Sequence, residues 1–128
     1  MPALIKHEDA TPEDAVRYLK VYLAAVDVME TSIAKFDTLA DYGEDENERN
    51  LARLHSLEIT RDLDIIKAKR RAFMTDTQGI NPPTDAQVQQ AQDLDAKLAA
   101  VQAHDGKTEA IMGIATDCFN CFQKIHPG

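Results

Sequence analysis

Tryptophan is absent from the chain, and aromatic residues make up only 5% of its 128 positions. The common residues are Ala, Leu, Asp, Glu, Gln and Lys instead. Strands are enriched in aromatic and β-branched residues, whereas straight-chain side chains lose little rotamer freedom in a helix. The composition therefore predicts an all-α protein, and the length suits a single domain, residues 1–128.

Long apolar runs and positive charge are also scarce. No run approaches the roughly 20 apolar residues of a membrane span, and the first residues lack the apolar stretch of a signal peptide. The expected compartment is the cytoplasm, where cysteines stay reduced. With 22 acids against 14 bases, the formal net charge is −8. Such a surface repels nucleic acids and anionic membranes, so we expect neither as a partner and favour a basic protein instead.

The motifs of common catalytic and metal sites are missing from the sequence. There is no P-loop, nucleophile elbow or HExxH sequence, and the Glu-x-x-His pairs of di-iron bundles have no counterpart. The acidic stretch after Gly43 lacks the alternating oxygen ligands and central glycine of an EF-hand loop. We therefore expect a protein that is not an enzyme and has no cofactor.

Capping and breaking residues divide the chain into an arm and four helices. Thr11 and Pro12 have the character of a helix cap and a first helical position, and Gly43 ends the helix that follows. The Pro82-Pro83 pair cannot continue a helix. The predicted elements are an N-terminal arm at 1–11, helices at 12–42, 46–75, 84–104 and 107–126, and a loop at 76–83. A single helix that continues through Gly106 is the alternative for the last two.

Apolar residues recur at alternating spacings of three and four in both long helices. The first seam is Leu19, Tyr22, Val26, Met29, Ile33, Phe36 and Ala40, and the second is Ala52, Ser56, Ile59, Leu63, Ile66, Arg70 and Phe73. Between residues 15 and 29 the first helix is apolar almost all round, so this half should be largely buried. These patterns predict an antiparallel helical bundle with a long first hairpin.

A polar line runs along the second helix, because His55, Asp62 and Lys69 are spaced by seven residues. The line is either a hydrogen-bonded network that faces inward or a groove at the surface. Buried networks of this kind tend to specify register rather than to add stability.

Both cysteines lie in the last eleven residues, CFNCFQKIHPG. On a helical wheel Cys118 falls in the middle of an apolar face and Cys121 nearer its edge, where core residues belong. A redox pair needs its first thiol at a helix N-terminus, and this pair lies near a C-terminus. Haem attachment of the cytochrome c-prime kind needs CxxCH, and residue 122 is Phe. We therefore interpret both cysteines as core residues.

Zinc is the alternative for this end of the chain. In an up-down-up-down bundle the end of the fourth helix lies near the start of the first, which would bring distant ligands together. The alternative metal set is Cys118, Cys121, His126 and His7. Zinc accepts such nitrogen and sulfur ligands, but a structural site usually has two close ligand pairs and this sequence has one.

The predicted helix lengths indicate a candidate binding surface. The first two helices, at about 30 residues each, would span about 45 Å, whereas the last two reach only about 30 Å. The end of the first hairpin would then project, with exposed apolar side chains beside an acidic turn. The predicted partner-binding residues are the apolar Phe36, Leu39, Tyr42, Leu51 and Leu54 and the acidic Glu44, Asp45 and Glu46.

These features together predict a non-enzymatic module that binds a protein partner through an apolar hairpin end with an acidic rim. Immunity proteins, secretion chaperones and small regulators include acidic bundles of this size. The alternatives are a metal-binding bundle that uses the Cys/His end and a structural homodimer.

Overall fold

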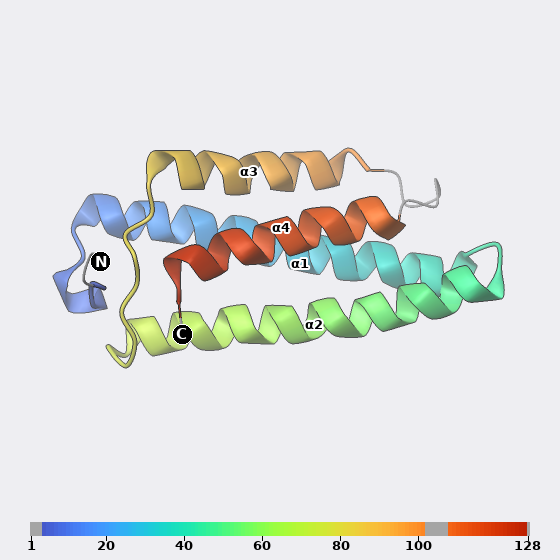
Figure 1. Cartoon of the computed structure of the whole chain (residues 1–128), viewed down its shortest axis with the longest axis horizontal. Helices are drawn as coiled ribbons and strands as arrows, with labels where there is room; N and C mark the ends of the chain where they lie inside the picture. Colours follow the sequence, from blue (N-terminus) through green and yellow to red (C-terminus); the bar gives the residue numbers. More distant parts are fainter. Residues whose placement is uncertain (1–3, 102–107, 128) are drawn as a thin grey trace.

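The computed structural model describes residues 4–101 and 108–127, and these form a bundle of four helices. The elements are the short 3-10 helix η1 (His7–Asp9) and the α-helices α1 (Pro12–Tyr42), α2 (Glu46–Met74), α3 (Asp85–Ala99) and α4 (Thr108–Ile125). Helices α1 and α3 run in one direction and α2 and α4 in the other (Figure 1). The predicted all-α antiparallel bundle with a long first hairpin is confirmed.

Capping side chains set the starts of three helices. The Thr11 hydroxyl accepts a hydrogen bond from the Asp14 N–H, and the Asp14 carboxylate accepts one from the Thr11 N–H. Thr84 and Gln87 form the same reciprocal pair at the start of α3. Asp45 alone caps α2, by accepting a backbone N–H at 2.7 Å. Each cap satisfies N–H groups that the first turn of a helix leaves without a partner.

Helix α3 ends at Ala99, before the predicted end at residue 104. The chain tightens there, because Ala100 and Val101 donate their N–H groups to carbonyls only three residues back. The Lys35 ammonium donates a hydrogen bond of 2.8 Å to the Val101 carbonyl. Helix α4 packs against α3 as a separate helix, so the alternative of one continuous helix is wrong. The predicted turn at Gly106 lies outside the described residues.

The core surrounds α1, which packs against each of the other three helices. The apolar positions of the predicted α2 seam are buried: Ala52, Ile59, Leu63, Ile66 and Phe73. Along α1 the prediction holds for four buried seam residues, Tyr22, Met29, Phe36 and Ala40. Large side chains from both long helices therefore fill the centre of the bundle.

One side of α1 is more exposed than its composition predicts. Val16, Leu19 and Leu23 are exposed, so the expectation that the first half of this helix is largely buried is wrong for that side. Spacings of three and four place the three side chains in one stripe along the helix. The neighbouring helices cover only part of the circumference of α1, and the remaining sector stays in water.

The N-terminal arm and the loop after α2 meet at one end of the bundle. Ile5 and Ile80 exchange two backbone hydrogen bonds of 2.9 and 2.8 Å, and Ile80 is fully buried. From the same loop, Asn81 bonds the Lys124 carbonyl through its side chain and the Ile125 carbonyl through its N–H, which caps α4. We call this end the base and the opposite end, residues 36–57, the tip.

Candidate functional site

The tip extends past the end of α3 and the start of α4 (Figure 1). Of the predicted apolar residues, Tyr42, Leu51 and Leu54 are exposed there, Tyr42 by 82%. Leu57, one turn further along α2, is also exposed and was not among the predicted residues. Its position off the predicted seam of α2 was the available signal.

Two of the predicted binding residues are buried, so their assignment to the surface is wrong. Phe36 is 0% exposed and Leu39 is also buried. The Phe36 ring packs against the His55 ring, with 5.3 Å between centroids, across the α1/α2 contact. The two long helices cover each other, and α3 and α4 are not needed to bury side chains on the facing sides.

The helical register explains why Tyr42 and Leu51 remain exposed. Tyr42 lies about two turns beyond Lys35, on the side of α1 that contacts the end of α3. Leu51 lies about five turns before Lys69, on the side of α2 that contacts α4. Tyr42 therefore lies on the side of α1 that α3 covers elsewhere, and Leu51 lies on the side of α2 that α4 covers elsewhere. Both are exposed because they lie beyond the described ends of α3 and α4.

An acidic rim surrounds these apolar side chains. Glu44, Asp45 and Glu46 are exposed, and none of them forms an ion pair with a described residue. The nearby cations are engaged elsewhere: Arg49 donates to the Gly43 carbonyl, and Arg53 donates to a carbonyl in the last turn of α1. The rim therefore keeps its negative charge, although Asp45 also has a structural role as the α2 cap.

The base does not assemble the alternative zinc site. Both cysteines are buried, which confirms their assignment to the core, and the Cys121 thiol points toward the Gln87 carbonyl of α3 at 3.8 Å. Burial raises the pKa of Cys118 to about 12, so the metal-binding thiolate is disfavoured. Within residues 4–101 and 108–127, no three His, Cys, Asp or Glu side chains are grouped to hold a metal ion.

His126 instead belongs to a buried aromatic cluster. It is 0% exposed, its Nε2 lies 2.9 Å from the Tyr18 hydroxyl, and its ring stacks on Phe122 at 5.1 Å. Burial lowers the pKa of His126 to about 4 and raises that of Tyr18. Both groups are therefore neutral near pH 7. His7 packs edge-on against Phe73 at the margin of this cluster.

The three residues of the polar line on α2 have different neighbours. Lys69 donates to the Gln123 side chain and, at 2.8 Å, to the His126 carbonyl, which leaves its ammonium at the end of α4. Cations stabilise a helix at this end. His55 is largely buried beneath the Phe36 ring, and burial raises the pKa of Asp62. All three residues are partly buried, and no described hydrogen bond links them to one another, so the inward-facing hydrogen-bonded network is not confirmed. Asp62 instead lines an open surface pocket with Leu57, Glu58 and Arg61.

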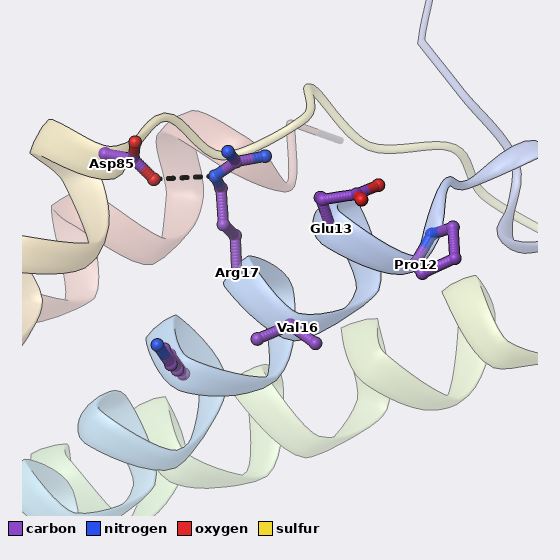
Figure 2. A pocket seen from close by; sticks show the side chains of 6 residues that line it. Pro12, Glu13, Val16, Arg17 and Asp85 are labelled. Atoms are coloured by element: carbon purple, nitrogen blue, oxygen red, sulfur yellow. Dashed lines mark hydrogen bonds and ion pairs between the residues drawn. The ribbon is translucent and has the colours of Figure 1, made fainter.

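A shallow pocket of about 350 Å³ lies between α1 and α3 near the base (Figure 2). Arg17 reaches across it from α1 and donates to the Asp85 carboxylate at 2.7 Å. This hydrogen bond lowers the pKa of Asp85. The sequence did not indicate this pair, which joins helices far apart along the chain. Because the Arg17 guanidinium is already paired with the Asp85 carboxylate, it is not free to bind an anionic ligand in this pocket.

A second contact between these helices brings two acids together. The Asp95 carboxyl of α3 lies beside the Asp27 carboxyl of α1. Burial, followed by the neighbouring Asp27, raises the pKa of Asp95 to about 7. Near neutral pH the pair can therefore share a proton, which ties α3 to α1 without a cation.

Comparison with known proteins finds no matching family model, no similar curated protein and no similar solved structure. None of the described helices is long and apolar enough to cross a membrane. Function is therefore inferred from the geometry of this chain, in which the tip combines exposed apolar groups with acids that no described cation pairs.

Proposed function

We propose that this protein is a non-enzymatic module that binds a partner protein through its tip, in the manner of small immunity proteins, chaperones and regulators. The observation that carries the proposal is the 82% exposure of Tyr42 on a line of α1 that is covered elsewhere in the bundle. A monomeric protein gains nothing from an aromatic ring in water, whereas an interface does.

The corrected surface has the composition of a protein interface. Its centre is Tyr42, Leu51, Leu54 and Leu57, and its rim is Glu44, Asp45 and Glu46. Tyrosine is among the residues that contribute most to binding when a partner covers them, because it adds large area at low entropy cost. The rim charges set the speed and the selectivity of association more than its strength.

The charge of the rim favours a basic partner. Its acids are not neutralised by described neighbours, so an approaching positive surface meets an unscreened negative one. Raising the salt concentration should slow such an encounter. The free cysteines, both buried, are compatible with a reducing compartment, and we place the protein in the cytoplasm on that ground.

Capture by matched variants tests the proposal. Immobilised wild type, Tyr42→Asp, Leu54→Asp and Val16→Asp would be exposed to an extract of the source cells. Val16 is the control, because it is 53% exposed against 52% for Leu54 and lies near the base. We expect a protein that wild type and Val16→Asp retain and that both tip variants lose. Capture that survives both tip substitutions would contradict the proposal.

A photo-crosslinking residue gives an independent readout. Placed at position 42, it should join the captured protein covalently, whereas the same residue at position 16 should not. Crosslinking from position 16 alone would move the interface away from the tip.

A further inference from the structure

A cationic groove crosses the α1/α2 contact in the half of the hairpin nearer the base. It has a volume of about 360 Å³ and is lined by Tyr22, Lys67, Arg70, Arg71, Met74 and Thr75. Three of these six residues carry positive charge, in a chain whose net charge is −8. The groove is therefore opposite in sign to the tip of the same molecule.

The cations of the groove have no acidic partner. The side chains of Lys67, Arg70 and Arg71 form no ion pair with any residue in the described part of the chain. The Arg70 guanidinium lies over the Tyr22 ring, 4.4 Å from its centroid. A guanidinium placed over an aromatic ring can still donate its N–H groups to a carboxylate.

Exposed apolar side chains adjoin the groove. Met74 lines it and is exposed, and Leu19 lies one turn before Tyr22 on α1. Leu19 belongs to the exposed stripe of α1, with Val16 and Leu23. The groove is thus cationic where the tip is anionic, so the two are complementary in charge.

We propose that the groove binds the tip of a second copy of this chain, so that two hairpins pair in antiparallel orientation. The inference rests on the tip as a binding surface and does not depend on the identity of any other partner. Asp41 is exposed at the end of α1, about five turns beyond Leu23 and so on the same side of the helix. Its carboxylate and that of Glu44 would meet the ammonium of Lys67 and the guanidinium of Arg71. Two equal contacts then form at once.

The dimensions of the hairpin allow both contacts together. About 25 residues of α2 separate its first turn from Arg71, which corresponds to roughly 38 Å along the helix. In an antiparallel pair this separation is the same in both chains, so each tip reaches the other groove. The interface is closed and twofold symmetric, whereas a single head-to-tail contact would leave free ends and grow into fibres.

Competition between the two uses of the tip follows from this arrangement. A dimer covers both tips, so a partner protein must displace the second copy before it binds. Self-association would therefore compete with binding of the partner protein.

Charge reversal at both surfaces tests the pairing. In the groove variant, Lys67→Glu and Arg71→Glu make the groove negative and leave Arg70 on Tyr22. In the tip variant, Asp41→Lys and Glu44→Lys make the tip positive and spare the Asp45 cap. Sedimentation velocity at low salt, from micromolar to millimolar protein, measures each oligomeric state.

Wild type should be dimeric, and each variant alone should dissociate with a constant raised about 100-fold, since like charges then face each other. An equal mixture of the two variants should restore a dimer, because both of its contacts again join opposite charges. The control Arg61→Glu with Lys97→Glu changes the net charge equally outside both surfaces and should leave the dimer intact. A wild type that stays monomeric, or a mixture that does not associate, would overturn the inference.

The dimerisation experiment and the partner-capture experiment can give independent results. The groove variant keeps its tip, so it should still capture the partner protein. Loss of dimerisation with capture retained or increased supports both proposals, because no second copy then has to be displaced. Charge-swap dimerisation without any tip-dependent capture would leave the self-association standing and remove the proposed function.

Discussion

The two ends of the bundle treat their side chains in opposite ways. At the base the arm, the loop after α2 and the ends of α1, α2 and α4 converge, and a histidine becomes 0% exposed. At the tip, α1 and α2 are the only described helices, and Tyr42 and Leu57 stay in water. Burial in this molecule is therefore decided by how many segments arrive at a position more than by the polarity of the residue found there.

The comparison also indicates which end is adapted for binding. Covering a leucine side chain is worth about 1.5–3 kcal/mol, so each exposed leucine at the tip is stabilisation that the monomer does not use. At the base the converging segments bury Ile80 completely and enclose even a polar side chain, His126. A protein selected only for stability would cover both ends.

The largest expected difference between the ends concerns two fully buried phenylalanines. Phe122→Ala at the base should lower the free energy of unfolding by about 3–5 kcal/mol, because Tyr18, Tyr22 and His126 surround the ring and cannot close the cavity. Phe36→Ala should cost about 3 kcal/mol, since two helices alone can move together. Urea denaturation measures both. An equal or larger loss at Phe36 would mean that the tip is packed as rigidly as the base.

Acid should weaken the base before the tip. The pKa of His126 is lowered to about 4 in the folded protein, from 6.5 in the unfolded chain. Between these values the unfolded chain binds a proton that the folded protein does not, so stability falls as the pH drops from about 6.5 toward about 4. The loss is roughly 2–4 kcal/mol at the end of this window.

His126→Gln removes the titrating group and retains a hydrogen-bonding partner for Tyr18. Its stability should be lower at pH 7 and should vary less with pH across the same window. Urea denaturation at intervals between pH 7 and pH 4, compared with wild type, provides the measurement. An unchanged slope would show that another group controls the acid response.

The opposite pH response is expected where α3 meets α1. The pKa of Asp95 is raised to about 7, so the folded protein binds the extra proton and this contribution to stability is lost as the pH rises through about 7. Asp95→Asn removes the charge beside Asp27. The loss of repulsion should stabilise the protein at pH 8, and by only about 1 kcal/mol because solvent screens the partly exposed pair. Stabilisation that is equally large at pH 5 would contradict the shared proton.

Caps should contribute about equally at the two ends, because they act locally. Asp45→Ala at the tip and Thr11→Ala at the base should each cost about 1 kcal/mol. Thermal unfolding followed by circular dichroism is sufficient to detect this. A negligible effect of Asp45→Ala would indicate that the first turn of α2 is held by the tip packing rather than by its cap.

The smallest effect should come from the tip surface itself. Leu54→Asp should change stability by no more than about 0.5 kcal/mol, because half of the side chain is in water already. The same substitution should abolish partner capture, so a large loss of stability would show that Leu54 is structural.

Local signals in the sequence predicted most of the fold. Thr11 and Pro12 place the start of α1, and the α2 seam from Ala52 to Phe73 is buried at its apolar positions. The error at Phe36 has a physical cause: the length argument considered cover from α3 and α4 and neglected the cover that α2 gives α1. Exposure of Leu19 escaped prediction because helical periodicity does not show how many neighbours a helix has.

The base could not be predicted from the sequence because its contacts are long-range. Tyr18 lies outside the predicted α1 seam, and its hydrogen bond to His126 joins opposite ends of the chain. No periodic pattern carries such information. The pairing of Ile5 with Ile80 likewise has no local signal, since neither residue lies in a predicted helix or strand.

The Ile5–Ile80 pairing has a kinetic consequence. Contacts within the α1/α2 hairpin span short loops and should form early, whereas the arm can dock only after the loop beyond α2 has reached its place. The base would then be the last part to assemble and the first to open. Substitutions that weaken the arm, such as Ile5→Ala, should speed unfolding and leave the folding rate almost unchanged. Hydrogen exchange at the Ile5 and Ile80 amides would report that opening directly, ahead of any loss of the hairpin.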